Sequence, residues 1–323
     1  MNINISYNIG LDLVRATESA ALTAGRWMGL GNPVEADKAA STALLTALNM
    51  VEMDGCIAVV REMGNLAPLD TDDNKIGTGS GPSIDIVYDA VDGINQLAKG
   101  YPGALSLVAV APNGCMWAPA TGVYMDKIVV NEQVAPYLVQ ECVSAPAAWT
   151  LALVARAKEK KISDLTVFLL DRPRHQELIN EIREAGARVL LRADGDISMG
   201  IQAAMPESRI DLFIGAGGIP EGLILACAVK SFGGAMLGRL DPQSENEREA
   251  IRKVGLDLDQ VLSVDELVTG DEVFFAATGI TGGSLLDGVH YKSGHAKTNS
   301  LLLRGETHTQ RFIVTQHYST SDD

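Results

Sequence analysis

Apolar residues recur at helical spacing in two stretches near the amino end of the chain, 9–31 and 35–53. The first stretch ends at Gly29 and Gly31, and the second, rich in alanine and leucine, ends at an Asp-Gly pair. This spacing predicts two helices. The apolar runs that come next are separated by turn-forming residues, and they predict strands at 56–60, 84–89, 104–112 and 126–131.

From about residue 150 the pattern becomes a regular alternation of strands and helices. Such alternation predicts a parallel sheet flanked by helices, in which ligands bind beyond the carboxyl ends of the strands. The segment 272–318 is again rich in strand-forming residues, and we expect it to return to the first sheet. The predicted strands of the alternating part are 164–171, 188–196 and 210–218, and its predicted helices are 148–160, 174–186, 197–206 and 220–234.

The chain has 323 residues, of which 46% are apolar, so it can bury the core of one large or two ordinary α/β domains. Its formal charge of −15 repels the phosphate backbone of nucleic acids and anionic membranes, and we expect neither as a partner. An acidic protein that binds a phosphorylated metabolite needs local positive charge, from a divalent metal ion or from converging arginines.

Cysteine usage and the amino-terminal residues predict a cytoplasmic location. The cysteines show no C-x-x-C spacing, so we expect reduced thiols in the core rather than zinc ligands or disulfides. The first twenty residues lack the basic region and apolar run of a secretory signal, and no apolar run of about 18 residues occurs.

Three aspartates lie in or directly after the predicted strand 84–89. Asp85 is within the strand, and Asp89 and Asp92 lie three residues apart just before Gly93. One interpretation is a solvated strand end that turns and caps a helix, since aspartate favours both positions. The other is a metal site, because crowded carboxylates repel one another unless a cation holds them.

Further candidates follow the predicted strands of the alternating part. Gly218 and Glu221 belong to the sequence GAGGIPEG, where a glycine-rich turn at a helix start suits phosphate and Glu221 suits a metal ion, although the glycines can equally serve tight packing. Arg172 and Arg174 either lie on the surface or bind an anion. Asp194 either forms a turn or, together with Asp196, accepts hydrogen bonds from sugar hydroxyls.

Other common catalytic patterns are missing from the sequence. No H-x₃-H, H-E-x-x-H, G-x-S-x-G or Cys/His arrangement occurs, which argues against a histidine-bound metal and against a covalent hydrolase. The remaining chemistry is carboxylate-bound Mg²⁺ or Mn²⁺ together with arginines, which suits a phosphorylated sugar.

The chain resembles the class II fructose-1,6-bisphosphatases, which include bifunctional fructose/sedoheptulose bisphosphatases. The motifs TESAAL, GRWMGLGN, EADKAA, KIGTGSG, DIVYDAVDG, YMDKIVV, PRH, DGD, GAGGIPEG and ATGIT occur in the order and spacing of that family, over residues 10–318. The resemblance implies a layered α/β/α/β/α sandwich of two subdomains, with a mixed sheet first and a parallel sheet second. It implies a metal-binding subdomain at 1–155, a substrate subdomain at 156–255 and a strand-rich segment at 256–323 that packs on the first.

The resemblance also implies metal-dependent removal of the 1-phosphate from fructose 1,6-bisphosphate, or from sedoheptulose 1,7-bisphosphate, in gluconeogenesis and sugar-phosphate metabolism. The implied partner is this small molecule, and we expect a homo-oligomer. The implied ligands of Mn²⁺ or Mg²⁺ are Asp37, Asp89, Asp92 and Glu221. The three aspartates among them are also the implied catalytic residues. The implied sugar-bisphosphate contacts are Asp92, Gly93, Tyr124, Arg172, Arg174, Asp194, Asp196 and Gly218.

Asp92 stands where the family has a glutamate and Arg172 where lysine is more usual, and three further positions depart from the family pattern. A metal-ligating glutamate is replaced by Arg61, an aspartate shortly after it by Asn65, and a threonine that contacts metal and phosphate by Ile94. Two hypotheses remain open at this point. The chain is either a sugar bisphosphatase with weakened activity, or a catalytically impaired relative with a structural, self-assembling or regulatory role.

Overall fold

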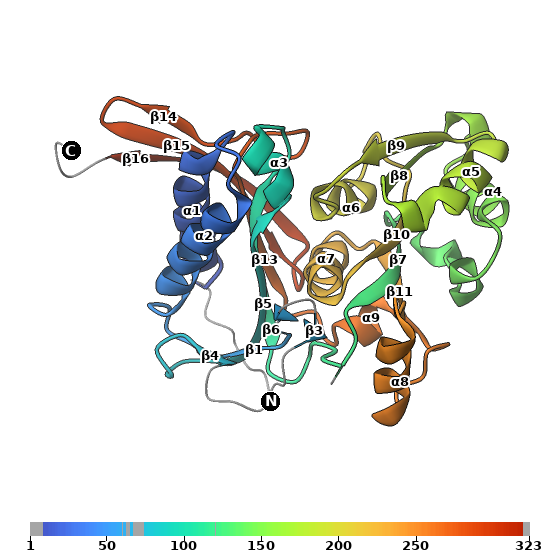
Figure 1. The fold of residues 1–323 in the computed structure, drawn as a ribbon, viewed down its shortest axis with the longest axis horizontal. Helices are drawn as coiled ribbons and strands as arrows, with labels where there is room; N and C mark the ends of the chain where they lie inside the picture. Colours follow the sequence, from blue (N-terminus) through green and yellow to red (C-terminus); the bar gives the residue numbers. More distant parts are fainter. Residues whose placement is uncertain (1–8, 60, 63–64, 67–73, 120, 319–323) are drawn as a thin grey trace. The chain divides into compact units, whose positions relative to one another are not determined.

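The computed structural model describes residues 9–59, 61–62, 65–66, 74–119 and 121–318, with the backbone alone at 61–62 and 65–66. The chain forms two compact units, shown in Figure 1. Unit 1 contains the described residues of 1–57, 75–114 and 272–323, and unit 2 contains those of 58–74 and 115–271.

Unit 1 is an eight-stranded mixed sheet with α1 and α2 on one face (Figure 1). The strand order is β14-β15-β13-β6-β5-β1-β4, with β16 paired to β15. Its helices are α1 (Ile9–Ala24), α2 (Pro33–Leu48) and α3 (Ile94–Lys99). Its strands are β1 (Asp54–Ile57), β4 (Lys75–Ile76), β5 (Ser83–Asp92), β6 (Leu105–Pro112), β13 (Phe274–Gly279), β14 (His290–Lys292), β15 (His295–Arg304) and β16 (Thr309–Tyr318).

Local signals in the sequence explain where the first helices lie. Pro33 begins α2, and the side chain of Asn32 accepts a hydrogen bond from the Glu35 backbone N–H at 3.2 Å, which satisfies one free donor of the helix. A buried chain of hydroxyls, Thr17–Thr278–Ser300, joins α1 to β13 and β15 through two contacts of 2.8 Å. Strand β13 pairs with β6, so the carboxyl-terminal strands belong to the same sheet as β5 and β6.

Unit 2 contains a six-stranded sheet with the order β12-β11-β7-β10-β8-β9. Its strands are β7 (Tyr124–Val130), β8 (Thr166–Leu170), β9 (Arg188–Arg192), β10 (Leu212–Gly218), β11 (Ala235–Leu240) and β12 (Val261–Ser263). Its helices are α4 (Ala147–Ala157), α5 (Gln176–Glu184), α6 (Ile197–Ala204), α7 (Ile219–Ser231), α8 (Glu245–Lys253) and α9 (Val264–Leu267), and a separate hairpin pairs β2 (Arg61–Glu62) with β3 (Asn65–Leu66).

The α/β sandwich of two subdomains is confirmed, but the second sheet is mixed rather than parallel. Strands β9, β8 and β10 run parallel to one another, as the alternating pattern predicted. Strand β7, which precedes the alternating segment in the chain, lies between β10 and β11 and runs antiparallel to both. The strands β10 and β11 therefore run in the same direction, as expected for two strands joined by a helix. They are not neighbours in the sheet, because β7 lies between them.

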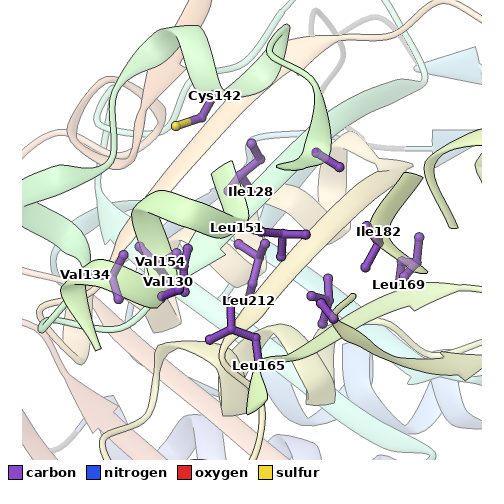
Figure 2. Close-up of a cluster of buried hydrophobic side chains, with 14 of the residues drawn as sticks. Ile128, Val130, Val134, Cys142, Leu151, Val154, Leu165, Leu169, Ile182 and Leu212 are labelled. Atoms are coloured by element: carbon purple, nitrogen blue, oxygen red, sulfur yellow. The ribbon is translucent and has the colours of Figure 1, made fainter. Parts of the chain in front are cut away.

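Helices cover both faces of the second sheet, α4 and α5 on one side and α6 and α7 on the other (Figure 1). Figure 2 shows the core between the sheet and the first pair, where Leu151 and Val154 of α4 meet Ile128 of β7 and Leu212 of β10. All four side chains are at most 2% exposed, and burial of each stabilises the unit by about 1.5–3 kcal/mol.

The helix α7 is buried on nearly all sides, in agreement with its largely apolar sequence, in which Glu221 and Lys230 are the charged residues. All four cysteines are free thiols. No helix in the described part of the chain is long and apolar enough to span a membrane.

Candidate active site

The implied site residues are divided between the two units. In unit 1, three aspartates and a glycine lie on α2, on the end of β5 and at the start of α3. In unit 2, the residues lie at the start of β7, after β8, after β9 and where β10 meets α7. The first group is Asp37, Asp89, Asp92 and Gly93, and the second is Tyr124, Arg172, Arg174, Asp194, Asp196, Gly218 and Glu221.

A bulge at the end of β5 places Asp89 and Asp92 on the same face of the sheet. In a regular strand, residues three apart point to opposite faces. Here Asp89 lies opposite Leu107 of β6 and Asp92 lies opposite Leu105, with a register shift between the two pairs. Because Leu105 and Leu107 are two residues apart and share a face, their partners share it as well. The bulge thus aligns two carboxylates that simple strand spacing would separate.

Hydrogen bonding and burial hold these two aspartates in place. The Asp89 carboxylate accepts a hydrogen bond from the Val91 backbone N–H at 2.9 Å, and Asp92 is only 5% exposed. Gly93 follows with a φ of 81°, in the left-handed region where glycine is favoured, and this lets β5 turn at once into α3. Ile94 is the half-buried first residue of α3.

Asp37 lies near the same strand end. Desolvation by the surrounding protein raises the pKa of Asp37, although the residue is exposed to solvent. Burial raises the pKa of Tyr88 on β5, and the charges of Asp37 and Asp89 raise it further. The Tyr88 phenol therefore stays protonated at neutral pH, in the electrostatic field of both aspartates.

In unit 2, His175 joins the carboxyl ends of β8 and β10. Its Nδ1 lies 2.8 Å from the Leu170 carbonyl oxygen, and its Nε2 lies 2.9 Å from the Ala216 backbone nitrogen. Only a neutral ring with the proton on Nδ1 donates to the first and accepts from the second. Burial lowers the pKa of His175, which favours this neutral form. This role cannot be read from the order of residues, because both partners of His175 are backbone groups.

We expect unfolding of unit 2 to become easier in mild acid because of His175. Its pKa is lowered in the folded protein, so the stabilising effect is complete above the ordinary value of 6.5 and is lost as the pH falls toward the lowered value. Each pH unit in that window costs at most about 1.4 kcal/mol. Thermal denaturation between pH 7.5 and 5 measures the loss, and His175→Gln should flatten the dependence. An equally steep dependence in that variant would contradict the assignment.

The substrate residues predicted after β8 and β9 lie close together. The Arg174 guanidinium donates to the Ala216 carbonyl oxygen at 2.8 Å and stacks on the Tyr124 ring, 5.1 Å from its centroid. Arg172 and Asp194 form an ion pair at 3.4 Å. Tyr124 in turn lies directly opposite Gly218 in the pairing of β7 with β10. Two guanidinium groups, a phenol and an aspartate therefore lie near one another at the carboxyl ends of the parallel strands of this sheet.

Lys127 of β7 is a site residue that the sequence analysis missed. Its Nζ lies 2.7 Å from Oδ2 of Asp196, and the exposed fractions of the two side chains are 0% and 8%. A β-carbon on Gly217 would lie against both groups, so glycine at this position makes room for the pair. The available signal was a lysine inside an otherwise buried strand, since such a lysine needs a buried counter-ion.

Glu221 lies in the first turn of α7, with its carboxylate folded back over Gly218. A β-carbon on Gly218 would overlap the Glu221 carboxylate. The backbone of Gly218 is extended, with φ −65° and ψ 153°, so its glycine serves this close approach rather than an unusual turn.

The carboxylates fit a divalent cation by donor type, though they do not form a complete cluster. Among the residues that the structure describes, no three His, Cys, Asp or Glu side chains are arranged to hold a metal ion. Carboxylate oxygens are the ligands that Mg²⁺ and Mn²⁺ prefer, and Asp89 and Asp92 offer an aligned pair. Arg61 and Asn65 begin β2 and β3, and their side chains lie outside the described residues.

Comparison with known proteins agrees with these observations. The family model described as bacterial fructose-1,6-bisphosphatase, glpX-encoded, matches residues 7–317. Fructose-1,6-bisphosphatase 1 class 2 of Escherichia coli K12 is 35% identical over 328 aligned residues, which cover 98% of this chain and 96% of the relative. The class 2 enzymes of Escherichia coli O6:H1 and Shigella flexneri match with the same 35% identity and the same coverage. This chain therefore belongs to the glpX-encoded, class 2 fructose-1,6-bisphosphatase family of phosphoric monoester hydrolases.

Proposed function

We propose that this chain hydrolyses the 1-phosphate of fructose 1,6-bisphosphate with the help of Mn²⁺ or Mg²⁺. The observation that carries the proposal is the bulge in β5, which puts the carboxylates of Asp89 and Asp92 on one face. A strand end that only needed solvation would not require the two anions to be aligned. Membership of a bisphosphatase family supports the same conclusion.

Each unit would contribute a different part of the chemistry. Asp37, Asp89 and Asp92 of unit 1 would hold the cation, and the family resemblance adds Glu221 as a further ligand. When bound, such a cation stabilises charge on the phosphoryl oxygens and lowers the pKa of an attacking water. Arg172 and Arg174 would bind phosphate, a task for which the guanidinium group is well shaped. Tyr124 and the carboxylates of Asp194 and Asp196 would orient the sugar through its hydroxyls.

The activity is expected to be weaker than in relatives that keep the family pattern. Arg61 stands where the family has a metal-ligating glutamate, and Ile94 stands where a threonine hydroxyl contacts metal and phosphate. We place the reaction in cytoplasmic sugar-phosphate metabolism, which is consistent with the four free thiols. Sedoheptulose 1,7-bisphosphate is a second substrate of the same chemical class.

The direct test is phosphate release from fructose 1,6-bisphosphate, compared with fructose 6-phosphate, in Mn²⁺, in Mg²⁺ and in EDTA. We expect release from the bisphosphate only with metal. Release that continues unchanged in EDTA would exclude metal-dependent hydrolysis. Release that matches a family member with the glutamate and threonine would overturn the expectation of weakened activity.

A second candidate, self-assembly, is favoured by the exposed edge of unit 1. Within the described residues β16 pairs with β15 alone, through ten consecutive residue pairs. Phe312, Val314 and Tyr318 alternate along one face of β16 and are 54%, 57% and 70% exposed. The strand has no proline, lysine or bulge, which are the usual devices that protect an edge.

The occupant that we propose for this edge is β16 of a second copy of the chain. Thr309–Tyr318 contains Arg311 and no carboxylate, whereas the whole chain carries a charge of −15. The strand therefore brings no negative charge of its own into a contact between two copies. A two-fold axis pairs the strand with itself antiparallel, so the same patch serves both copies.

We expect the chain to sediment as a dimer or larger oligomer and Val314→Lys to shift it toward the monomer, since an edge lysine opposes strand pairing. The matched control is Val254→Lys, at a residue that is 51% exposed after α8. Analytical ultracentrifugation of both variants measures the shift. A wild-type monomer, or an oligomer that survives Val314→Lys, would rule out this interface.

A further inference from the structure

We propose that Lys127 is a positioning residue that fixes Asp196 for recognition of a sugar hydroxyl. The proposal rests on the function proposed above, in which Asp196 contacts the sugar. Lys127 itself does not touch the substrate in this proposal. It acts through the 2.7 Å contact between its Nζ and Oδ2 of Asp196.

The first argument is the position of Asp196 in its helix. Asp196 is the residue immediately before α6, where aspartate normally accepts a hydrogen bond from a backbone N–H of the first turn. Its side chain makes no such bond, although a cap of this kind is worth about 1 kcal/mol. The carboxylate is directed to Lys127 instead. Its orientation is therefore set by the lysine, across 69 residues of sequence, rather than by the local turn.

The second argument is that the pair is a poor way to stabilise a core. The Lys127 side chain is completely buried, and its only charged hydrogen-bond partner in the described part of the chain is Asp196. Removing two charges from water costs about as much as their attraction returns, so a hydrophobic pair of similar size would stabilise the unit equally well. If Lys127 holds the Asp196 carboxylate in the orientation needed to bind a sugar hydroxyl, the presence of this buried ion pair is explained.

The third argument concerns the groups that surround the pair. The Lys127 ammonium also lies 5.6 Å from the centroid of the Phe213 ring, and Gly217 and Gly222 leave room for its side chain. The ammonium therefore has one well-defined position. With Oδ2 held by Lys127, the other oxygen, Oδ1, is the atom that would accept a hydrogen bond from a sugar hydroxyl.

The test compares ligand binding by Lys127→Met, Asp196→Asn and the double variant. Titration calorimetry with fructose 1,6-bisphosphate in EDTA measures binding without turnover, and inorganic phosphate is the second probe. We expect Lys127→Met to weaken bisphosphate binding by about tenfold or more, which is typical for loss of a hydrogen bond to a charged group. Binding of inorganic phosphate should be unchanged, since the arginines bind it.

Non-additivity distinguishes positioning from a general loss of structure. If Lys127 acts through Asp196, the double variant should bind no more weakly than Asp196→Asn alone. The control is Lys158→Met, because Lys158 and Asp211 form a buried ion pair in the same unit, with side chains 6% and 1% exposed, although Asp211 keeps a second partner in Lys160. Asp211 precedes β10 and so lies at the other end of that strand from Gly217. We expect this control to change affinity by less than about twofold.

A second variant covers the case in which Lys127→Met does not fold. Gly217→Ala keeps both charges and adds a β-carbon that only flexible side-chain ends would meet, the Lys127 Nζ and the Asp196 Oδ2. It should displace the pair and weaken bisphosphate binding while leaving phosphate binding intact. Wild-type affinity for the bisphosphate in a folded Lys127→Met or Gly217→Ala protein would overturn the positioning role alone. If the wild type binds the bisphosphate only with metal, the same variants are compared by their KM in Mg²⁺. A wild-type protein that neither binds nor hydrolyses the bisphosphate would overturn the proposed function and this inference together.

Discussion

Replacing Arg61 by glutamate together with Ile94 by threonine is expected to raise phosphate release from fructose 1,6-bisphosphate by about 10²- to 10³-fold, the usual effect of one electrostatic stabiliser of a transition state. Like unit charges about 4 Å apart repel by about 4 kcal/mol at an effective dielectric constant near 20, and a divalent cation feels roughly twice that. The exchange of guanidinium for carboxylate removes this repulsion and restores a ligand. The expectation follows from the family pattern, since the Arg61 side chain is outside the described residues.

Two matched variants isolate the cause of this increase. Arg61→Gln removes the positive charge without supplying a ligand, and Ile94→Val changes the shape at position 94 without supplying a hydroxyl. We expect each to give a small part of the gain. If the double change leaves the turnover number at the wild-type level, the two departures do not limit activity, and the case for a weakened metal site fails.

Gly218→Ala is expected to lower kcat by about 10²-fold or more with little loss of stability, as is typical when one charged stabiliser is misplaced. The atoms nearest to the added β-carbon belong to the Glu221 carboxylate, which is the flexible end of a side chain and can turn away. The alanine itself is compatible with the extended backbone at this position. The result expected is a folded protein whose Glu221 is displaced from its place over Gly218.

A comparison with the double variant tests whether displacement of Glu221 causes the loss of kcat in Gly218→Ala. In a protein that already carries Glu221→Gln, Gly218→Ala should lower kcat little further, because the two changes affect the same contact. Melting temperature and steady-state kinetics of the four proteins complete the cycle. Losses that multiply in the double variant would show that Gly218 acts through another contact, such as its pairing with Tyr124.

The sequence predicted the elements that depend on local spacing. The helices α4 to α7 and the strands β8 to β10 follow the alternation of apolar residues, because each element buries one face and its period is visible along the chain. The insertion of β7 between β10 and β11 could not be seen in this way. It depends on pairing between distant segments, which leaves no local period in either.

The candidate site shows the same division between local and long-range information. Aspartates at a strand end were visible, but the bulge that aligns Asp89 with Asp92 depends on the register with β6. The role of His175 depends on two backbone groups, and the partner of Lys127 lies 69 residues away. Sequence motifs located the regions, and only the fold supplied the contacts.

The central claim is that the aligned carboxylates of β5 bind a divalent cation. Titration calorimetry of Mn²⁺ into the protein with fructose 6-phosphate, which lacks the scissile 1-phosphate, together with inorganic phosphate, tests this most directly. We expect saturable uptake of Mn²⁺ by the wild type and loss of that uptake in both Asp89→Asn and Asp92→Asn. Uptake that is absent from the wild type, or that persists unchanged in both variants, would contradict it.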